Sequence, residues 1–344
     1  MIKAIDFFCG AGGVTCGFKQ AGIDVLGGLD IDIACKETYE QNNNTKFLLT
    51  DISKMKKSIL KKEFGIRQND SDLIFIGCSP CQYYTNLKTD KTKSKESRML
   101  IDDFREFVDY YKPGYVFIEN VPGFEKKDDS PLMKFKQFLE DNNYHVVAKV
   151  LNAKYYGVPQ NRRRFVLLAS RLKSEIKLPE EDKDTDNNVR NSIGDPKTFP
   201  FIEAGHKDNS QFKHWAARLS KRNLKRIRKT PMNGGSRKAW ADNPELQLEC
   251  YKNHLGHWDV YGRMQWEKAS PTITTRFNSY SNGRYGHPEQ DRAISLREGA
   301  TLQTFPLVYI FYSDSQTKIA KMIGNAVPPE LARRIGNIIS NSSY

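Results

Sequence analysis

Short apolar runs alternate with amphipathic segments through the first half of the chain. The apolar runs have the length and composition of buried strands and cover residues 2–8, 25–29, 73–76 and 115–118. Helical spacing of apolar residues falls between them, for example at 103–111 and 132–139. Alternating strands and helices predict an α/β fold whose parallel sheet carries helices on both faces. Two further runs, 146–151 and 165–169, predict a later strand pair.

The pattern changes after Arg171. Residues 179–198 are polar and contain two prolines, which is the composition of a linker. Residues 206–240 hold eleven Lys or Arg against one acid, Asp208. The end of the chain, from Gly324 onward, predicts a turn into a helix with an apolar face. The second half therefore predicts a separate, loop-rich and basic part of the molecule.

Composition narrows the class of partner. A net charge of +13 over 344 residues favours a polyanion, either nucleic acid or an anionic membrane surface, although a merely basic protein is the alternative. No apolar run approaches the ~20 residues that span a bilayer, and the first residues lack the pattern of a signal peptide. The six cysteines are not spaced as a disulfide framework, so we expect a reducing, intracellular protein.

A glycine-rich turn follows the first predicted strand, in Asp6–Gly13. Such a turn lets a ligand approach the backbone, and Asp30, placed 20 residues after Gly10, suits the hydroxyls of a ribose. Residue 15 is Thr where a dinucleotide fingerprint has its third glycine. This disfavours a pyrophosphate and is compatible with a nucleoside cofactor. A tight strand-to-helix turn without a ligand is the alternative.

The segment Cys78-Ser79-Pro80-Cys81 follows the strand 73–76 and has three interpretations. It could be a redox dithiol, half of a zinc site, or a loop that carries one nucleophile. A zinc site needs two more ligands, and no second paired cluster has suitable spacing, so no metal is expected.

Two further polar features end or begin predicted strands. Glu119 lies at the tip of the apolar run 115–118, where an acid is costly unless it is paired or functional. Arg162 and Arg164 precede the strand 165–168 and share one face if the segment is extended, which suits a phosphate or a base carbonyl oxygen. The alternatives are a solvent-exposed acid and a solvated run of charge.

Taken in order, these motifs resemble those of the cytosine-5 DNA methyltransferases of bacterial and phage restriction-modification systems. The matching segments are Asp6–Gly13, Asp30, Asp51-Ile52, Pro80-Cys81-Gln82, Glu119-Asn120-Val121, Gln160-x-Arg162-x-Arg164, 292–306 and 324–327. Only about 171–268 lies outside them, where the family has its variable recognition region. Two departures are Tyr83-Tyr84-Thr85 after the cysteine and Thr272-Ile273 in place of Thr-Leu.

The resemblance implies a Rossmann-like α/β fold that depends on S-adenosylmethionine, with a smaller, mixed target-recognition domain. We expect a catalytic and cofactor-binding domain at 1–175, the recognition domain at 176–290, and a return segment at 291–344 that completes the first domain. The cofactor pocket implied by the family comprises Phe8, Gly10, Ala11, Gly12, Gly13, Asp30, Ile31, Asp51, Ile52, Pro80, Leu100, Asn325 and Ala326. The last two imply that the carboxyl-terminal helix packs on the first domain.

The resemblance also implies the mechanism. The thiolate of Cys81 would attack C6 of a flipped-out cytosine, and C5 would then accept the methyl group. Glu119 would stabilise the charge that develops at ring N3, and Arg164, with Arg162 nearby, would bind the base oxygen or position the thiolate. Cys78 gains no role and is interpreted as a small buried hydrophobe.

Double-stranded DNA is the expected partner. The residues expected to contact it are Gln82, Lys221, Arg222, Lys225, Arg226, Arg228, Lys229, Arg237, Thr272, Asn278 and Arg284, with the basic ones on phosphates. We expect a cytoplasmic monomer that works alongside a restriction endonuclease without forming a stable complex with it. An RNA cytosine-5 methyltransferase and a catalytically silent DNA-binding homologue are the alternatives.

Overall fold

The computed structural model describes residues 1–79, 91–123, 130–172, 176–251 and 258–341. Contacts divide the chain into two units. The first comprises 1–156, 163–182 and 326–344, and the second comprises 157–162 and 183–325. Among the described residues, no helix has both the length and the apolar character that a membrane crossing requires.

The first unit is built on a seven-stranded sheet in the order β3-β2-β1-β4-β5-β8-β6. The strands are β1 (Lys3–Phe7), β2 (Asp24–Asp30), β3 (Lys46–Leu49), β4 (Leu73–Gly77), β5 (Tyr115–Asn120), β6 (His145–Asn152) and β8 (Arg163–Ser170). The strands from β3 to β5 run parallel, as the alternating pattern predicts, whereas β8 is antiparallel to both of its neighbours. The predicted pair at 146–151 and 165–169 is therefore confirmed, and it makes the sheet mixed.

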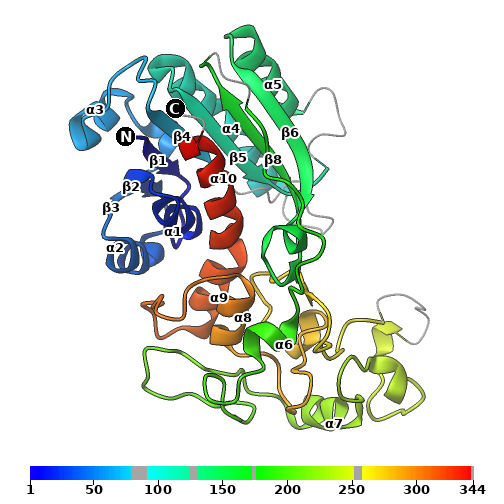
Figure 1. Cartoon of the computed structure of the whole chain (residues 1–344). Helices are drawn as coiled ribbons and strands as arrows, with labels where there is room; N and C mark the ends of the chain where they lie inside the picture. The colour runs from blue at the N-terminus through cyan, green and yellow to red at the C-terminus, as the bar shows by residue number, and fades with distance from the viewer. Residues whose placement is uncertain (80–90, 124–129, 173–175, 252–257, 342–344) are drawn as a thin grey trace. The chain divides into compact units, whose positions relative to one another are not determined.

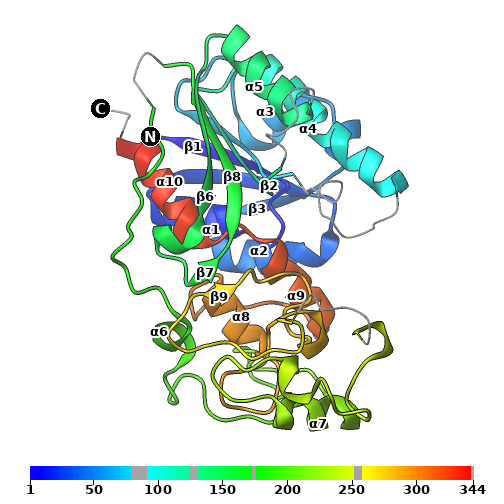
Figure 2. The ribbon, with the colours of Figure 1, turned by 90° about the vertical axis from the view of Figure 1, so that its right-hand side faces the viewer.

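Helices cover both faces of this sheet (Figures 1 and 2). One face carries α4 (Lys91–Tyr111) and α5 (Pro131–Asp141), and the other carries α1 (Gly13–Gln20) and α10 (Pro329–Asn341). Two further helices, α2 (Lys36–Asn43) and α3 (Ser58–Phe64), follow β2 and β3. The predicted α/β architecture with helices on both faces is thus confirmed.

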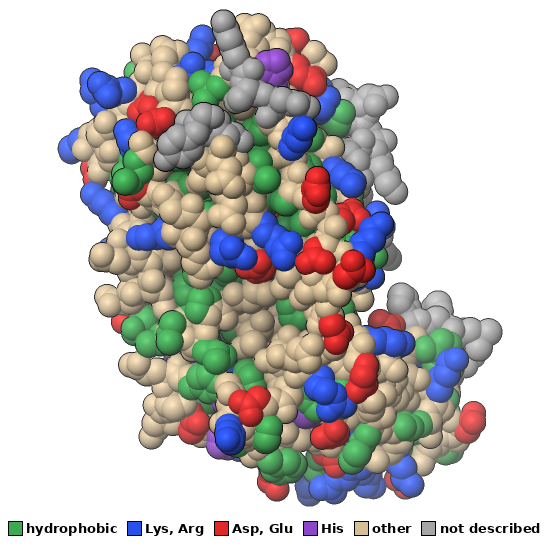
Figure 3. All heavy atoms as spheres, viewed as in Figure 1, with side chains coloured by type: hydrophobic (Ala, Val, Ile, Leu, Met, Phe, Trp, Pro, Cys, Tyr) green, Lys and Arg blue, Asp and Glu red, His purple; other side chains and the backbone are tan. Residues whose placement is uncertain are grey.

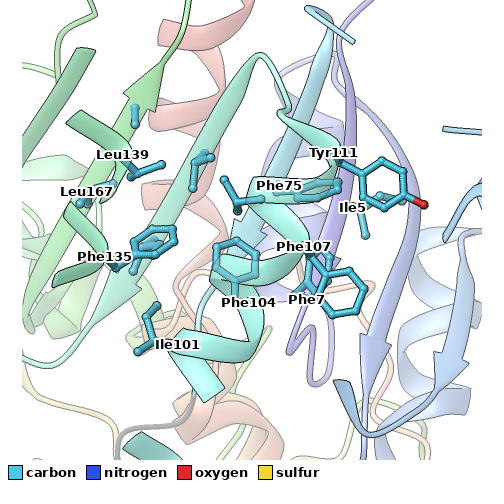
Figure 4. Packing of buried hydrophobic residues seen from close by; sticks show 14 of the residues in the cluster. Ile5, Phe7, Phe75, Ile101, Phe104, Phe107, Tyr111, Phe135, Leu139 and Leu167 are labelled. Carbon is cyan, nitrogen blue, oxygen red and sulfur yellow. The ribbon is translucent and has the colours of Figure 1, made fainter. Parts of the chain in front are cut away.

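Alternating side chains of each strand enter the cores on the two faces. Phe7 and Phe75 pack edge to face at 5.0 Å and meet Phe104 of α4 (Figure 4). On the opposite face, Phe117 of β5 lies 5.6 Å from Phe18 of α1. Strands that are apolar on both faces explain why their sequences read as continuous apolar runs.

The carboxyl-terminal helix α10 packs closely against α1. A Cβ atom on Gly17 would lie 2.2 Å from the carbonyl oxygen of Pro329, so only glycine allows this approach. The prediction that the carboxyl-terminal helix packs on the first domain is confirmed.

In its described residues, the second unit has little regular structure and one small sheet, in which β7 (Gln160–Asn161) pairs with β9 (Ser270–Pro271). Its helices are α6 (Val189–Ile193), α7 (Lys221–Lys229), α8 (Leu296–Leu302) and α9 (Gln316–Asn325). One of its cores contains Ile227, Trp240, Leu246, Tyr261 and Tyr280.

The unit boundaries differ from the predicted ones. Residues 291–325, expected in the return segment, group with the second unit, and only 326–344 return to the first. The physical reason is that this segment is bonded to residues 212–215 of the second unit. Arg297 donates to the carbonyl oxygen of Phe212 at 2.7 Å, and the hydroxyl of Ser295 shares a hydrogen bond with the ring of His214 at 2.8 Å.

Candidate active site

The polar residues singled out from the sequence gather at one edge of the first unit's sheet. β1, β2, β4 and β5 are parallel neighbours, so their carboxyl ends lie on the same side. Phe8 follows β1, Asp30 ends β2, and Glu119 lies one residue before the end of β5. In open α/β sheets this edge is the usual position of a ligand site.

The glycine-rich turn has the conformation that its composition predicts. Gly10 and Gly12 have φ angles of 50° and 87°, where glycine avoids strain, and even Phe8 has a φ of 61°. A Cβ atom on Gly13 would lie 2.4 Å from the carbonyl oxygen of Val327 and 3.1 Å from the Cβ of Ala326. The turn is therefore shaped by the carboxyl-terminal segment of the same unit.

Asp30 is fixed by two backbone donors. The amide of Gly10 donates to one carboxylate oxygen and the amide of Asp32 to the other, both at 2.8 Å. Burial raises the pKa of Asp30, and these two hydrogen bonds oppose the rise. The carboxylate is thus oriented beside the turn, and each oxygen keeps a lone pair for a ribose hydroxyl.

Thr15, which departs from the strict glycine fingerprint, has a structural role. Its hydroxyl donates to Asp6 at 2.7 Å and shares a hydrogen bond with the hydroxyl of Tyr39 at 3.0 Å. Asp6 is 1% exposed, and burial raises its pKa to about 7. Thr15 therefore ties α1 to β1 and to α2 beneath the turn.

The other expected cofactor residues differ in burial. Asp51, just after β3, accepts from the amide and hydroxyl of Ser53, and the hydroxyl bond is the main cause of its lowered pKa. Ile52 is buried, Leu100 is half-buried against the core, and Ile31 is 71% exposed. An exposed isoleucine at the edge of a sheet suits contact with a flat apolar surface. Pro80 lies outside the described residues.

Glu119 and Arg164 meet on adjacent strands of the first unit. The Nε atom of Arg164 lies 2.9 Å from a carboxylate oxygen of Glu119, and both side chains are largely buried. The cationic partner of Glu119 is thus Arg164, the residue expected to bind the base oxygen or to position the thiolate. Cys81 and Gln82 lie outside the described residues. β4, which leads to Cys81, ends at Gly77 beside β5.

Arg162 has a different environment from Arg164. It belongs to the second unit, is 2% exposed, and donates to the carbonyl oxygens of Ile273 at 3.2 Å and Gly324 at 3.5 Å. Arg164, in contrast, belongs to the first unit and pairs with Glu119. The two arginines therefore have different partners, and their action at one spot stays a prediction.

Some of the residues of α7 that were predicted to contact DNA are exposed, and others bind other groups of the protein. Basic side chains gather over this helix (Figure 3). Arg226 is nevertheless buried, donates to the carbonyl of Leu246 at 2.7 Å, and lies over the rings of Trp240 and Tyr261. Its expected phosphate contact is replaced by a structural role, because it faces the core of the second unit.

Three more basic residues of α7 have protein partners. Arg222 donates to the carbonyls of Glu245 and Gln247, Lys225 pairs with Glu245 at 3.3 Å, and Arg228 lies 3.7 Å from Asp291. Lys221 and Lys229 are exposed and form no ion pair within the described part of the chain. Among the described residues, these two lysines are the cations of the helix that have neither an acidic nor a carbonyl partner.

The remaining expected DNA contacts also vary. Arg237 is buried over the ring of Trp258 at 4.2 Å, which replaces its expected role in base recognition with packing. Thr272 donates to the carbonyl of Asn161 at 2.7 Å. Asn278 and Arg284 are half-buried. Asn278 follows the buried Phe277, and Arg284 precedes Tyr285, whose hydroxyl donates to the carbonyl oxygen of Thr272.

The fold of this chain is similar to that of solved methyltransferase structures. The chain matches the fold of a methyltransferase encoded within an E. coli prophage with a TM-score of 0.73, at 20% identity and over 99% of both chains. At this identity the likeness shows the fold alone, a Rossmann-like α/β fold.

The sequence then specifies the family. A model for the C-5 cytosine-specific DNA methylases matches residues 2–341. The chain is 40% identical to the type II methylase M.HgiDII of Herpetosiphon aurantiacus, over 97% of this chain and 94% of that protein. It is 32% identical to the type II methyltransferase M1.HphI of Haemophilus parahaemolyticus, over 97% and 86%. The chain belongs to the C-5 cytosine-specific DNA methylase family and is a DNA (cytosine-5-)-methyltransferase.

The residues at the sheet edge fit S-adenosylmethionine, the methyl donor of this family. The glycine-rich turn lets a ligand approach the backbone closely. It lacks the third glycine of the fingerprint that binds a pyrophosphate, as expected for a cofactor that has no pyrophosphate. The oriented carboxylate of Asp30 suits a ribose diol. The chemistry that the cofactor supplies when bound is an electrophilic methyl group.

Proposed function

We propose that this enzyme methylates cytosine through a covalent bond between Cys81 and C6 of the base. The observation that supports the proposal is the buried pair of Glu119 and Arg164, at the sheet edge where β4 leads toward Cys81. A charged pair is costly to bury without a function or a compensating partner. Its position beside the strand of the expected nucleophile is the reason to assign it to the reaction.

The expected steps use these residues in turn. Attack of the Cys81 thiolate on C6 pushes an electron pair toward C5 and ring N3, and Glu119 donates a hydrogen bond or a proton to N3, which stabilises the negative charge there. Arg164 keeps Glu119 oriented and is available to the base oxygen. After C5 accepts the methyl group, a base removes the C5 proton, the C5–C6 double bond forms again, and the thiolate leaves.

The cofactor contacts are proposed as follows. Asp30 would bind the ribose hydroxyls, and Asp51 with Ile52 and Ile31 would bind the adenine. Phe8, the turn 10–13, Leu100 and Ala326 would line the pocket. Pro80 and Asn325 are assigned to it by resemblance alone.

The DNA contacts are proposed from exposure. Lys221 and Lys229 would contact phosphates, whereas Asn278 and Arg284, which stand beside anchored aromatic residues, would read bases. By analogy with the type II relatives, the methylation would protect DNA in the cytoplasm from a partner endonuclease, without a stable complex between the two enzymes. We expect the enzyme to act as a monomer.

Replacing Cys81 by Ser tests the mechanism. Bisulfite sequencing of DNA from cells that express the protein should show methylated cytosines at one short sequence, and Cys81→Ser should show none because a hydroxyl is a far weaker nucleophile at neutral pH. Cys78→Ser is the matched control and should keep its activity. Methylation by Cys81→Ser at the normal rate would refute the covalent mechanism.

Trapping the adduct provides an independent test. Duplex DNA with 5-fluorocytosine at the methylated position should form a stable complex with the enzyme, because fluorine cannot leave as a proton does. Denaturing gel electrophoresis detects this complex, and Cys81→Ser should not form it. An active enzyme that forms no complex would exclude attack at C6.

A further inference from the structure

A cluster of three buried polar side chains lies within the second unit and has no role in the mechanism above. Gln160, Arg162 and Gln303 are each at most 2% exposed. They come from β7, from the residue after it, and from the residue that follows α8; Figure 2 labels these two elements. Burying such groups is unfavourable unless their hydrogen bonds are satisfied in one arrangement.

The amides of the two glutamines connect the cluster. Gln160 donates to the side-chain oxygen of Gln303 at 2.7 Å and accepts from the amide of Ile273 at 2.8 Å. Gln303 donates to the carbonyl oxygen of Ile323 at 2.8 Å. Each amide thus bridges segments that are more than 100 positions apart in the chain or lie in different elements.

Gln303 and Arg162 both donate to one end of α9. Ile323 and Gly324 are in its last turn, where helix carbonyls have no partner within the helix. Gln303 binds the first of these carbonyls and Arg162 the second, and the charge of Arg162 suits the negative end of the helix dipole.

The backbone at the same helix end leaves no room for adjustment. A Cβ atom on Gly324 would lie 2.3 Å from the carbonyl carbon of Thr274. Thr274 follows Ile273, which both Gln160 and Arg162 hold. The end of α9 is therefore fixed by side chains and by direct backbone contact.

We propose that Gln160, Arg162 and Gln303 form a clamp on the end of α9 that positions Asn325 and Ala326 for the cofactor. This inference rests on the proposed assignment of those two residues to the cofactor pocket. Asn325 is the last residue of α9, and Ala326 contacts the glycine-rich turn at Gly13. Arg162 is thereby a positioning residue, distinct in role from Arg164.

Binding of S-adenosylhomocysteine, measured by isothermal titration calorimetry on the full chain, tests the clamp. Gln303→Met keeps the volume but removes both hydrogen bonds, so the dissociation constant should rise roughly tenfold. Tyr280→Phe is the matched control, since it removes a buried hydrogen bond to Thr230 elsewhere in the second unit. It should leave the dissociation constant unchanged.

Two comparisons make the outcome decisive. If Asp30→Ala abolishes binding while Gln303→Met binds like the wild type, the clamp is refuted and the cofactor site stands. If Asp30→Ala also binds like the wild type, the cofactor assignment and the clamp both fail. Should Gln303→Met not fold, Gln303→Glu keeps the shape and the acceptor for Gln160 but loses donation to Ile323.

Arg162→Lys separates positioning from catalysis. Lysine keeps the charge but cannot reach two carbonyls in the geometry of a guanidinium group. The clamp predicts a higher dissociation constant for S-adenosylhomocysteine. The single-turnover rate of methylation at saturating S-adenosylmethionine should stay near the wild-type value. Unchanged binding with a collapse of that saturated rate would assign Arg162 to the reacting base and overturn the proposal.

Discussion

At the scale of residues, several arginine side chains of this protein are buried. Arg263 is 1% exposed and donates to the carbonyls of Ile227, Thr230, His287 and Gln290. The basic segment 206–240 predicts exposed arginines at 226 and 237, because charged residues usually lie at the surface, whereas both are buried. The partners of Arg226 and Arg263 include backbone carbonyls, and Arg237 lies over the ring of Trp258; the sequence pattern indicates none of these contacts.

Asp6 is a residue whose burial has a measurable consequence. Its pKa in the folded protein is raised to about 7 from 3.8, chiefly by burial, so between these values the folded chain keeps a proton that the unfolded chain releases. The stability that this proton confers is complete below the unfolded pKa and is lost as the pH rises through about 7. Asp6→Asn cannot ionise and should not suffer this loss.

The comparison is made by urea unfolding at pH 5 and pH 8. The difference in the free energy of unfolding, Asp6→Asn minus wild type, should be more positive at pH 8 than at pH 5 by on the order of 2 kcal/mol. The exposed Asp24→Asn on the neighbouring strand is the control and should show no such gain. Parallel pH profiles for Asp6→Asn and the wild type would show that Asp6 is ionised in the folded state throughout.

At the scale of elements, the apolar runs predict the strands themselves, including the pair β6 and β8, but not the antiparallel direction of β8. Apolar runs predict strands that are buried on both faces, and this holds for β1, β4 and β5. The direction of β8 depends on its connection from β6 through Ala153–Tyr156 and β7, which has no periodic pattern. In the second unit, short helices and isolated turns are held by side-chain networks, so periodicity could not predict them.

The packing of α1 on α10 yields a prediction about an element. Gly17→Ala would place a methyl group 2.2 Å from the oxygen of Pro329 and 2.7 Å from the Cβ of Ala332, so the helices must separate. Although alanine favours a helix, we expect the free energy of unfolding to fall by roughly 1–3 kcal/mol. Gln20→Ala, exposed on the same helix, should be neutral or stabilising, and equal effects of the two substitutions would contradict the close approach.

At the scale of the whole molecule, a net charge of +13 predicts affinity for DNA but not the surface that binds it. The structure narrows the choice on α7, because Arg222, Lys225, Arg226 and Arg228 have protein partners and Lys221 and Lys229 do not within the described residues. A cation that already has an acceptor gains less from a phosphate than a free one.

Salt dependence distinguishes a phosphate contact from a general effect of charge. If Lys221 and Lys229 each neutralise a phosphate, replacing both by Ala should reduce the slope of log affinity against log salt by roughly 2. Replacing Lys36 and Lys62, which are exposed on the first unit, removes the same net charge and should change the slope less. Fluorescence anisotropy with one duplex across a salt series measures both, and equal slopes for the two double variants would mean that net charge, and not α7, determines the salt dependence.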